Sequence, residues 1–314
     1  MRAPTRLRAG LFGAAALALA CAVGPLVLPT PPAPDPVRAA LQRPGTRVTT
    51  VTLIDGTAFS SPNVAAEGDS IVIGTDIRRR VLPRDRVGSV EDHRFWLGSD
   101  RFGRDVLRRL LTGGRVSLAI AAFAVFVALI LGSAVGMIAA SAGGIVDALL
   151  MRTVDALLAF PVLFLMILAA TLFRPSAALL VLLLGVTSWM GLARLVRGQV
   201  LSLRTRPFVL AARSSGTRPH RIALLHYLPN LVGPLAQDTA LRMGDIIIAE
   251  ATLSYLGLGV PPSIPTWGSM VAEGHQVMLD GWWLAVFPGV AIAGLVICLA
   301  LIGDGLQQLG DASA

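Results

Sequence analysis

Two acidic residues, Asp245 and Glu250, lie in a long and otherwise largely apolar stretch of the sequence. Carboxylates in such a stretch are costly to place in lipid, so they are expected to face protein or water. On the wall of a polar pathway they would favour cationic groups such as an amine. A structural pair is an equal alternative, because Arg242 precedes Asp245 by three residues. Both acids are therefore candidates for the lining of a pathway, with a structural role left open.

Residue patterns for nucleotide binding, covalent catalysis or metal binding are missing from the sequence. The formal net charge is +8, and the 27 residues of the Lys and Arg class are all arginine. Without lysine the chain cannot carry a Walker A phosphate loop, a Schiff-base lysine or a Ser/Lys hydrolase site. The histidines at 93, 220, 226 and 275 have no metal-ligand spacing with one another or with Cys21 and Cys298, and no GxSxG motif occurs. We expect no catalytic, metal-binding or cofactor-binding residue, so any nucleotide energy must come from another chain.

A charged and apolar segment runs from Gly98 to Gly114. Ser99 or Asp100 is suited to cap a helix, and Asp105 and Arg109 have the spacing of an ion pair on one helix face. We expect an amphipathic helix over 97–115, lying on the membrane surface. The alternative is a gate element at the outer opening. Its residues would be Gly98, Asp100, Gly103, Arg104 and Asp105.

An arginine-rich connection spans residues 204–221. Pro207 suits the first turn of a helix, residues 208–215 would form two turns, and Gly216 is placed to end them in a left-handed conformation. Thr217 and Pro219 would start a new helix. A two-turn helix is too short to be stable alone. We therefore expect it to dock against something, and a solvated positive loop is the alternative.

Long uncharged runs must position these segments. The 314 residues are 54% hydrophobic and 15% charged, against about a quarter charged in soluble domains, which excludes a soluble enzyme and a disordered chain. A membrane-spanning helix needs about 20 residues. The runs without Asp, Glu or Arg are 9–28, 116–146, 156–173, 175–193, 222–237 and 281–303. They predict an all-α membrane protein with six transmembrane helices, the fifth of which continues, kinked or broken, as far as Val260.

Two features predict how these helices meet. The third and fourth runs are separated only by Arg174 and Pro175, which indicates a tight hairpin between antiparallel helices. Contacts between membrane helices favour small residues. The second run supplies a row of them, Gly132, Ser133, Gly136 and Ala140.

The arginines of the short connections predict cytoplasmic termini. Seven lie between residues 194 and 221 with no acid among them, and Arg2, Arg6, Arg8 and Arg152 fall on the same side. The opposite short connections hold Arg174 alone, with Glu273 and Asp280. The first run has an alternative as a cleaved secretory signal, since Ala18-Leu19-Ala20-Cys21 faintly resembles a lipoprotein site. Its removal would not change the orientation of the rest.

The large polar segment between the first two runs would then lie outside the cytoplasm. It opens with a proline-rich stretch over 29–36, and β-branched runs at 48–54, 58–60 and 70–75 are separated by Asp55-Gly56 and Glu67-Gly68-Asp69. This pattern is typical of hairpins. We expect a small β-rich insert packed over the outer mouth.

The arginine-rich connection resembles the cytoplasmic "EAA" signature of ABC importer permeases: Glu-Ala-Ala, three residues, Gly, nine residues, a hydrophobic residue, any residue, Leu-Pro. Ala211-Ala212, Gly216 and Leu228-Pro229 match at this spacing. Leu210 replaces the usual Glu, and His226 replaces an aliphatic residue. The loss of Glu removes one polar contact that would help anchor the loop.

Further segments narrow the resemblance to the C-type subunits of dipeptide, oligopeptide and nickel permeases. It covers about residues 97–309, while 46–93 looks like an insertion. The matching segments are Leu97-Gly98-Ser99-Asp100, Gly103-Arg104-Asp105-Val106-Leu107, Gly143-Gly144-Ile145-Val146-Asp147, Phe160-Pro161, residues 250–260, Pro265-Thr266-Trp267-Gly268 and Asp304-Gly305-Leu306. Trp267 is expected to anchor the outer loop at the membrane interface.

This resemblance implies a type I ABC importer permease in a bacterial inner membrane. It implies a homologous second permease subunit, two cytoplasmic ATPases that bind the helix at 207–216, and an extracytoplasmic binding protein. The expected organisation is residues 1–29 as the N-terminus and first helix, 30–96 as the linker and insert, 97–115 as the interfacial helix, and 113–309 as the permease domain. The coupling residues would be Pro207, Leu210, Ala211, Ala212, Gly216, Leu228 and Pro229.

Two other classes remain as alternatives. A secondary transporter could use Asp238, Asp245 and Glu250 as a proton relay, but the connection at 204–221 would then have no role. A membrane-embedded hydrolase lacks a recognisable nucleophile or metal motif. Peptides are the expected solute, with nickel or another small solute as the alternative.

Overall fold

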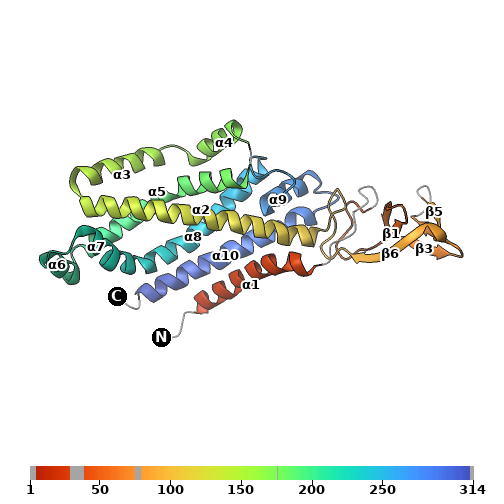
Figure 1. The fold of residues 1–314 in the computed structure, drawn as a ribbon, viewed down its shortest axis with the longest axis horizontal. Helices are drawn as coiled ribbons and strands as arrows, with labels where there is room; N and C mark the ends of the chain where they lie inside the picture. Colours follow the sequence, from red (N-terminus) through yellow and green to blue (C-terminus); the bar gives the residue numbers. More distant parts are fainter. Residues whose placement is uncertain (1–4, 29–38, 75–78, 175, 312–314) are drawn as a thin grey trace. The chain divides into compact units, whose positions relative to one another are not determined.

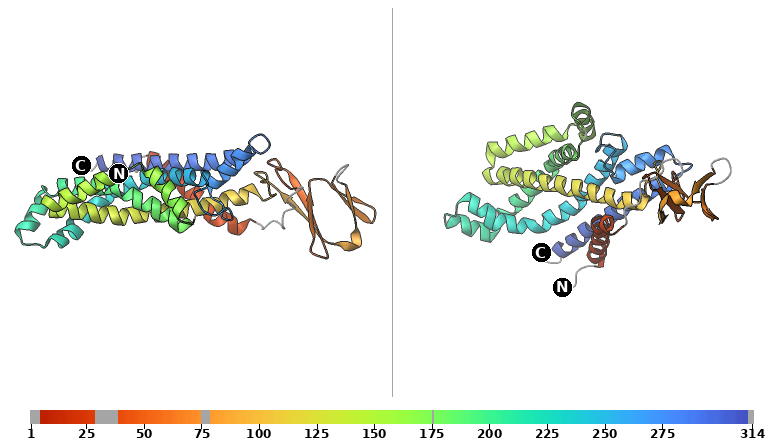
Figure 2. Two further views of the ribbon diagram at one scale, coloured as in Figure 1. Left: turned by 90° about the horizontal axis from the view of Figure 1, so that it is seen from above. Right: turned by 45° about the vertical axis from the view of Figure 1, so that its right-hand side comes forward.

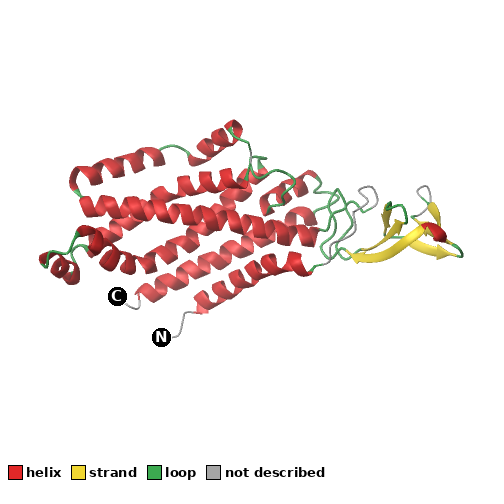
Figure 3. Ribbon diagram, viewed as in Figure 1, coloured by secondary structure: helices red, strands yellow, loops and turns green. Residues whose placement is uncertain are grey.

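The computed structural model describes residues 5–28, 39–74, 79–174 and 176–311, and most of them are helical (Figures 1 and 3). The helices are α1 (Thr5–Val27), α2 (Val106–Ala142), α3 (Gly144–Leu158), α4 (Val162–Leu172), α5 (Ala177–Leu203), α6 (Pro207–Ser214), α7 (Pro219–Ile222), α8 (Leu228–Tyr255), α9 (Trp267–Gln276) and α10 (Trp283–Asp311). Arg2, the proline-rich stretch 29–36, Thr75 and Pro175 lie outside the described residues.

Within these described ranges, four helices are long and apolar enough to cross a membrane: α1, α2, α5 and α10. The third expected span is divided between α3 and α4. Pro161 accounts for the break, because a proline disfavours helical conformation in the preceding residue and cannot donate a backbone hydrogen bond. The fifth expected span falls in α8, which carries Asp238, Arg242, Asp245 and Glu250 and is correspondingly less apolar.

The chain divides into two compact units, which are described separately. Unit 1 comprises residues 1–17, 116–263 and 292–314, and unit 2 comprises 18–115 and 264–291. In unit 1, α5 packs against α3, α4 and α8. Figures 1 and 2 show the first turns of α1 and the last turns of α10 at the same end of this unit as α6 and α7. Arg6 of α1 and Asp304 of α10 form an ion pair there, with 3.7 Å between nitrogen and oxygen.

The row of small residues on α2 is the contact with α5, as the sequence predicts. A Cβ atom built on Gly132 would lie 2.5 Å from a methyl carbon of Leu192, and one on Gly136 would lie 2.5 Å from the backbone oxygen of Ala193. Ala140 continues the row and is fully buried. Because no side chain fits at these glycines, the two helices approach closely and gain dispersion contacts along the seam.

Replacing Gly136 with leucine should therefore destabilise unit 1. The added side chain would meet the Ala193 backbone oxygen and Val196, and overpacking of this kind costs about 1–3 kcal/mol. Thermal unfolding of the purified protein in detergent measures the effect. Gly198→Leu is the matched control, because a Cβ there meets no atom within 4 Å. Equal stability of the two variants would contradict the close packing of α2 and α5.

Residues 47–73 and 80–94 of unit 2 contain two small antiparallel sheets, whose strands are shown as arrows in Figure 3. Their strands are β1 (Arg47–Leu53), β2 (Ala58–Ser61), β3 (Val64–Glu67), β4 (Ser70–Ile73), β5 (Arg80–Pro83) and β6 (Val87–Arg94). The strand orders are β2-β1-β6 and β3-β4-β5. The expected strands at 48–54, 58–60 and 70–75 overlap β1, β2 and β4. Val51 from one sheet and Ile71, Ile73 and Leu82 from the other are buried in a common core.

Candidate functional site

The helix expected at 208–215 is present as α6, and local chemistry accounts for both of its ends. Pro207 occupies the first turn, where its missing N–H costs nothing. Gly216 adopts a φ of 77°, its N–H donates to the Arg213 carbonyl, and the Thr217 N–H donates to the Ala212 carbonyl. These bonds satisfy carbonyls at the end of the helix that would otherwise lack donors. The chain then turns into α7.

One face of α6 is buried and the other is exposed. Val209 is fully buried and Ala212 is buried, and both pack in a core with residues of α5 and α7. Phe208 and Leu210 are 42% and 49% exposed, and Ala211 is exposed too. The buried side chains fix a helix that would not be stable alone. Leu210 therefore presents an apolar side chain outward at the position where the signature has Glu.

Leu228 and Pro229 follow a feature that the sequence analysis missed. Residues 223–227 form a π-helical turn between α7 and α8, in which the Leu228 N–H donates to the Ala223 carbonyl. Pro229 has no N–H, and its ring conflicts with the carbonyl four residues earlier, so a widened turn suits this position. The turn also places the ring of His226 with its centroid 6.0 Å from that of Phe208 on α6. The unusual His226 therefore lies against α6.

Two of the seven arginines between residues 194 and 221 form ion pairs with acids of α3. Arg197 donates two hydrogen bonds to Asp147, at 2.5 and 2.7 Å, and Arg194 is paired with Asp155. The hydrogen bonds from Arg197 hold the pKa of Asp147 below its ordinary value. The sequence contains no spacing that specifies these pairs, since the two acids are two helical turns apart and the two arginines only about one turn apart. These ion pairs tie α3 to α5.

The other five arginines of the connection have no ion pair with a described residue. Arg204 donates to the Ala140 carbonyl at the end of α2, and Arg213 donates to the Tyr227 hydroxyl at 3.0 Å. Arg206, Arg218 and Arg221 are exposed. Helix α6 is therefore bordered by positive charge, with no Asp or Glu in the sequence between Asp155 and Asp238.

In unit 2, the expected helix over 97–115 is wrong in its first half. Residues 98–105 form turns, with φ values of 86° at Gly98 and 75° at Gly103, and the helix begins only at Val106. Asp100 does not cap it: its carboxylate accepts hydrogen bonds from the backbone N–H groups of Phe102 and Arg104, at 2.8 and 2.9 Å, which closes the turn. Asp105 takes the capping role and accepts from the Arg108 N–H. Two left-handed glycines and a turn-forming aspartate outweigh the amphipathic pattern.

The expected pair between Asp105 and Arg109 is also wrong. The Arg109 guanidinium, 8% exposed, contacts Asp100 at 2.7 Å and both carboxylate oxygens of Glu273 on α9, at 2.6 and 2.9 Å. Arg104 donates to Asp100 at 2.6 Å. Asp105 instead bonds the His93 ring at 2.7 Å. This network fastens the turn segment to the first turn of α2 and to α9.

The charge of Glu273 should make the stability of unit 2 depend on pH. Burial alone would raise the pKa of Glu273, but the hydrogen bonds and charge of Arg109 outweigh it and bring the pKa below its ordinary value. The stabilisation is therefore complete above about pH 4.3, the pKa in an unfolded chain, and is lost as the pH falls through the lower folded value. We expect the stability difference between wild type and Glu273→Gln to shrink below about pH 4. Unfolding midpoints between neutral and acidic pH measure it, with the exposed Glu91→Gln as control; a difference independent of pH would contradict it.

The two acids of α8 have different environments. Glu250 is fully buried, and its carboxylate accepts hydrogen bonds from the hydroxyls of Ser117 on α2, at 3.0 Å, and Ser254, at 2.7 Å. Asp245 is exposed. Arg242, considered as its partner, instead pairs with Asp238 at 2.8 Å. The acids therefore do not form one site, and Glu250 has a packing role between α2 and α8.

Trp267 does not lie at a surface of unit 2, contrary to the expected interface anchor. It is 1% exposed, and its ring N–H donates to the Leu110 carbonyl of α2 at 2.9 Å. Thr266 precedes it as the cap of α9, in a reciprocal pair with Ser269. Trp267 is therefore a core residue that joins α9 to α2.

Comparison with known proteins agrees with this arrangement. Residues 132–313 match the family described as binding-protein-dependent transport system inner membrane component. A putative peptide transport permease of Brucella suis is 41% identical over 237 residues, 76% of this chain and 77% of that protein. The oligopeptide transport permease OppC of Haemophilus influenzae is 37% identical over 223 residues, 71% of each chain. The glutathione transport permease GsiD of Pectobacterium atrosepticum is 37% identical over 227 residues, 72% of this chain and 75% of that protein.

Among solved structures, the inward-facing MetNI methionine ABC transporter matches with a TM-score of 0.52 at 20% identity, covering 65% of this chain and 96% of that one. This likeness concerns the fold, which is that of a type I ABC importer permease. The relatives are transport permeases and not enzymes. The chain therefore belongs to the family of binding-protein-dependent transport inner membrane components and is a permease subunit of an ABC importer.

Proposed function

We propose that the chain forms half of the translocation pathway of a peptide importer, and that residues 207–216 dock into a groove of a cytoplasmic ATPase. The observation that carries this proposal is that α6 has one buried face and one exposed, partly apolar face. Val209 and Ala212 anchor it, while Phe208 and Leu210 point outward. A fixed helix with exposed apolar side chains suits a docking surface better than a solvated loop.

The charges around α6 indicate the chemistry of that groove. Arg206, Arg218 and Arg221 are exposed and form no ion pair with a described residue. Leu210 adds an apolar contact where a Glu would have added negative charge. We therefore expect the ATPase groove to combine an apolar pocket for Phe208 and Leu210 with acidic residues on its rim.

The orientation follows from the same segment. The first turns of α1 and the last turns of α10 lie at the end of unit 1 that carries α6, so both ends of the chain would be cytoplasmic. Arginine predominates in the short connections on that side. The insert at 47–94 and the segment 98–105, which follow α1 in the chain, would then be extracytoplasmic.

A second, homologous permease subunit would complete the pathway, and an extracytoplasmic binding protein would deliver the solute. Gly98, Asp100, Gly103, Arg104 and Asp105 would form part of the outer gate. Their turns are held by ion pairs that could open or close as one body. Asp245, exposed on α8, is the better candidate of the two acids to meet a cationic group of the solute. Peptides are proposed as the solute because the relatives are named for peptides and glutathione.

Reconstitution tests the proposal. Vesicles would contain the permease with its second subunit, both ATPases, internal ATP and the external binding protein. Uptake of a labelled oligopeptide should require ATP and fall to background when either the ATPases or the binding protein are left out. Uptake that persists without ATPases and follows a proton gradient would show a secondary transporter instead. Uptake of labelled nickel but not of peptide would agree with an ABC importer and refute the proposed peptide solute.

A further inference from the structure

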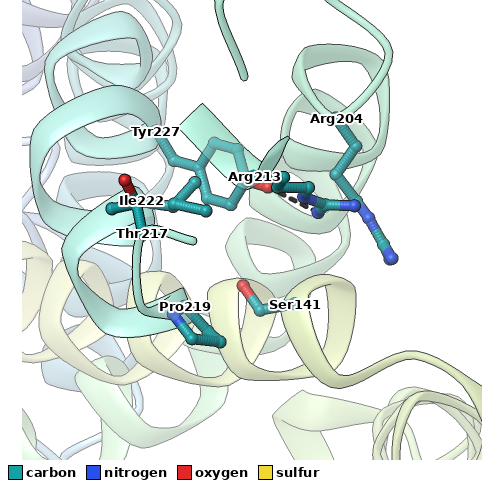
Figure 4. Close-up of a pocket in the computed structure, with 7 residues that line it drawn as sticks. All are labelled: Ser141, Arg204, Arg213, Thr217, Pro219, Ile222 and Tyr227. Atoms are coloured by element: carbon teal, nitrogen blue, oxygen red, sulfur yellow. Dashed lines mark hydrogen bonds between the residues drawn. The ribbon is translucent and has the colours of Figure 1, made fainter. Parts of the chain in front are cut away.

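A polar cavity lies in unit 1 behind residues 207–216, which we name the coupling segment (Figure 4). Its volume is about 220 Å³. The ends of three helices line it, with Ser141 from α2, Arg204 following α5, and Arg213 from α6. Thr217 and Tyr227 complete its polar wall. We name this cavity the coupling-loop pocket. This volume is far larger than the volume that one water molecule occupies in the liquid, about 30 Å³.

The pocket is positively charged. Arg204 and Arg213 both line it, and no carboxylate is among its lining residues. A guanidinium carries five N–H donors, whereas Arg204 uses one on the Ala140 carbonyl and Arg213 uses one on the Tyr227 hydroxyl. The rest have no acceptor among the described residues. Two guanidinium groups beside one cavity repel each other unless an anion screens them, and the same charge excludes a metal cation.

Ser141 gives a second and independent observation. Its hydroxyl oxygen is buried and has no hydrogen-bond partner among the described residues. Figure 4 shows this hydroxyl directed into the pocket, toward the side where the two arginines lie. A buried hydroxyl without a partner costs free energy. The Ser141 hydroxyl can therefore donate a hydrogen bond to a ligand in the pocket.

We propose that the coupling-loop pocket binds one phosphate-type oxyanion, held by Arg204, Arg213 and the Ser141 hydroxyl. A tetrahedral oxyanion offers acceptors in several directions, which suits donors that arrive from three helix ends. Once bound, it ties α6 to the ends of α2 and α5 and stiffens the coupling segment. The anion is either free phosphate or the phosphate of a lipid headgroup, which share this chemistry. The proposal does not depend on the coupling role, since binding is measured without transport.

The full-length protein in nanodiscs provides the test, with hydrogen exchange of residues 204–227 and thermal unfolding as readouts. In one arm, the nanodiscs contain digalactosyldiacylglycerol only, an uncharged lipid without phosphate, and inorganic phosphate is titrated against chloride at equal ionic strength. In the other, phosphatidylglycerol replaces part of the lipid, and phosphate is absent. Protection in the first arm identifies free phosphate, and protection in the second alone identifies a headgroup. Protection in neither arm overturns the proposal.

Two variants of pocket residues and one control distinguish binding in the pocket from attraction to surface charge in general. Ser141→Ala removes a buried hydroxyl that bonds no described residue, so its stability in chloride should be no lower than that of wild type, while its affinity for the anion falls about tenfold. Arg213→Gln should weaken binding by more than tenfold. Arg218→Gln removes the same charge from a residue that is exposed, as Arg213 is, but lies outside the lining, and it should change affinity less than twofold. Equal affinities in Arg213→Gln and Arg218→Gln, or full affinity in Ser141→Ala, would refute the assigned site.

Discussion

Replacing Gly216 with valine is expected to lower uptake at least tenfold while the subunit stays folded in the membrane and the ATPases continue to hydrolyse ATP. Gly216 adopts a φ of 77°. A left-handed conformation costs an ordinary residue about 1–2 kcal/mol, and more for a β-branched one. Because each 1.4 kcal/mol changes an equilibrium about tenfold, the turn that ends α6 should be mostly lost. Reconstituted vesicles measure uptake and ATP hydrolysis in parallel.

A matched substitution distinguishes backbone conformation from bulk. No atom lies within 4 Å of a Cβ built on Gly216, so the first side-chain carbon of either variant has space there. Asparagine tolerates the left-handed conformation far better than valine does. Gly216→Asn should therefore retain most of the uptake that Gly216→Val loses. Equal loss in both variants would show that side-chain size matters and that the coupling segment is not held by its turn; wild-type uptake in Gly216→Val would refute its coupling role.

The ends of α6 could be predicted because a few neighbouring residues determine them. Pro207 and Gly216 act through their own backbone preferences, and both do in the structure what they would do in a peptide. The small residues on α2 were predictable for a similar reason, since their spacing alone forms a row on one helix face. Gly132 and Gly136 indeed lie against α5.

Contacts between residues distant in the sequence could not be predicted in this way. Arg109 has a suitable acid four residues earlier, but its guanidinium reaches Asp100 and Glu273, 164 residues away. Asp105 is used instead at the helix start and by His93. Trp267 looked like an interface anchor because tryptophan often lies there, and only the packing of α9 on α2 reveals it as buried. Periodicity finds the faces of a helix but not the partner that covers each face.

Arg109→Met should be among the most destabilising substitutions in unit 2. The Arg109 side chain is 8% exposed, and it neutralises Asp100, which is 1% exposed, and Glu273, which is 17% exposed. Without Arg109, Arg104 alone balances both acids, at 2.6 Å from Asp100 and 3.7 Å from Glu273. Removing one member of a buried ion pair costs about 3–5 kcal/mol. Thermal and denaturant unfolding of the purified protein measure the loss. Arg101→Met is the control in the same segment, because Arg101 contacts Gln276 only at the surface, and it should change stability by less than about 0.5 kcal/mol.

Removing the charge of Glu273 as well tests why Arg109→Met loses stability. In Arg109→Met combined with Glu273→Gln, the carboxylate of Glu273 is gone and Asp100 keeps Arg104, 2.6 Å away, as a partner. If uncompensated charge causes the destabilisation, the double variant should be more stable than Arg109→Met alone, although one more residue has been changed. If lost packing of the arginine stem causes it, the double variant should be no more stable than the single one. Because this network fastens residues 98–105, which we propose as part of the outer gate, a rescued double variant should also recover part of the uptake lost by Arg109→Met.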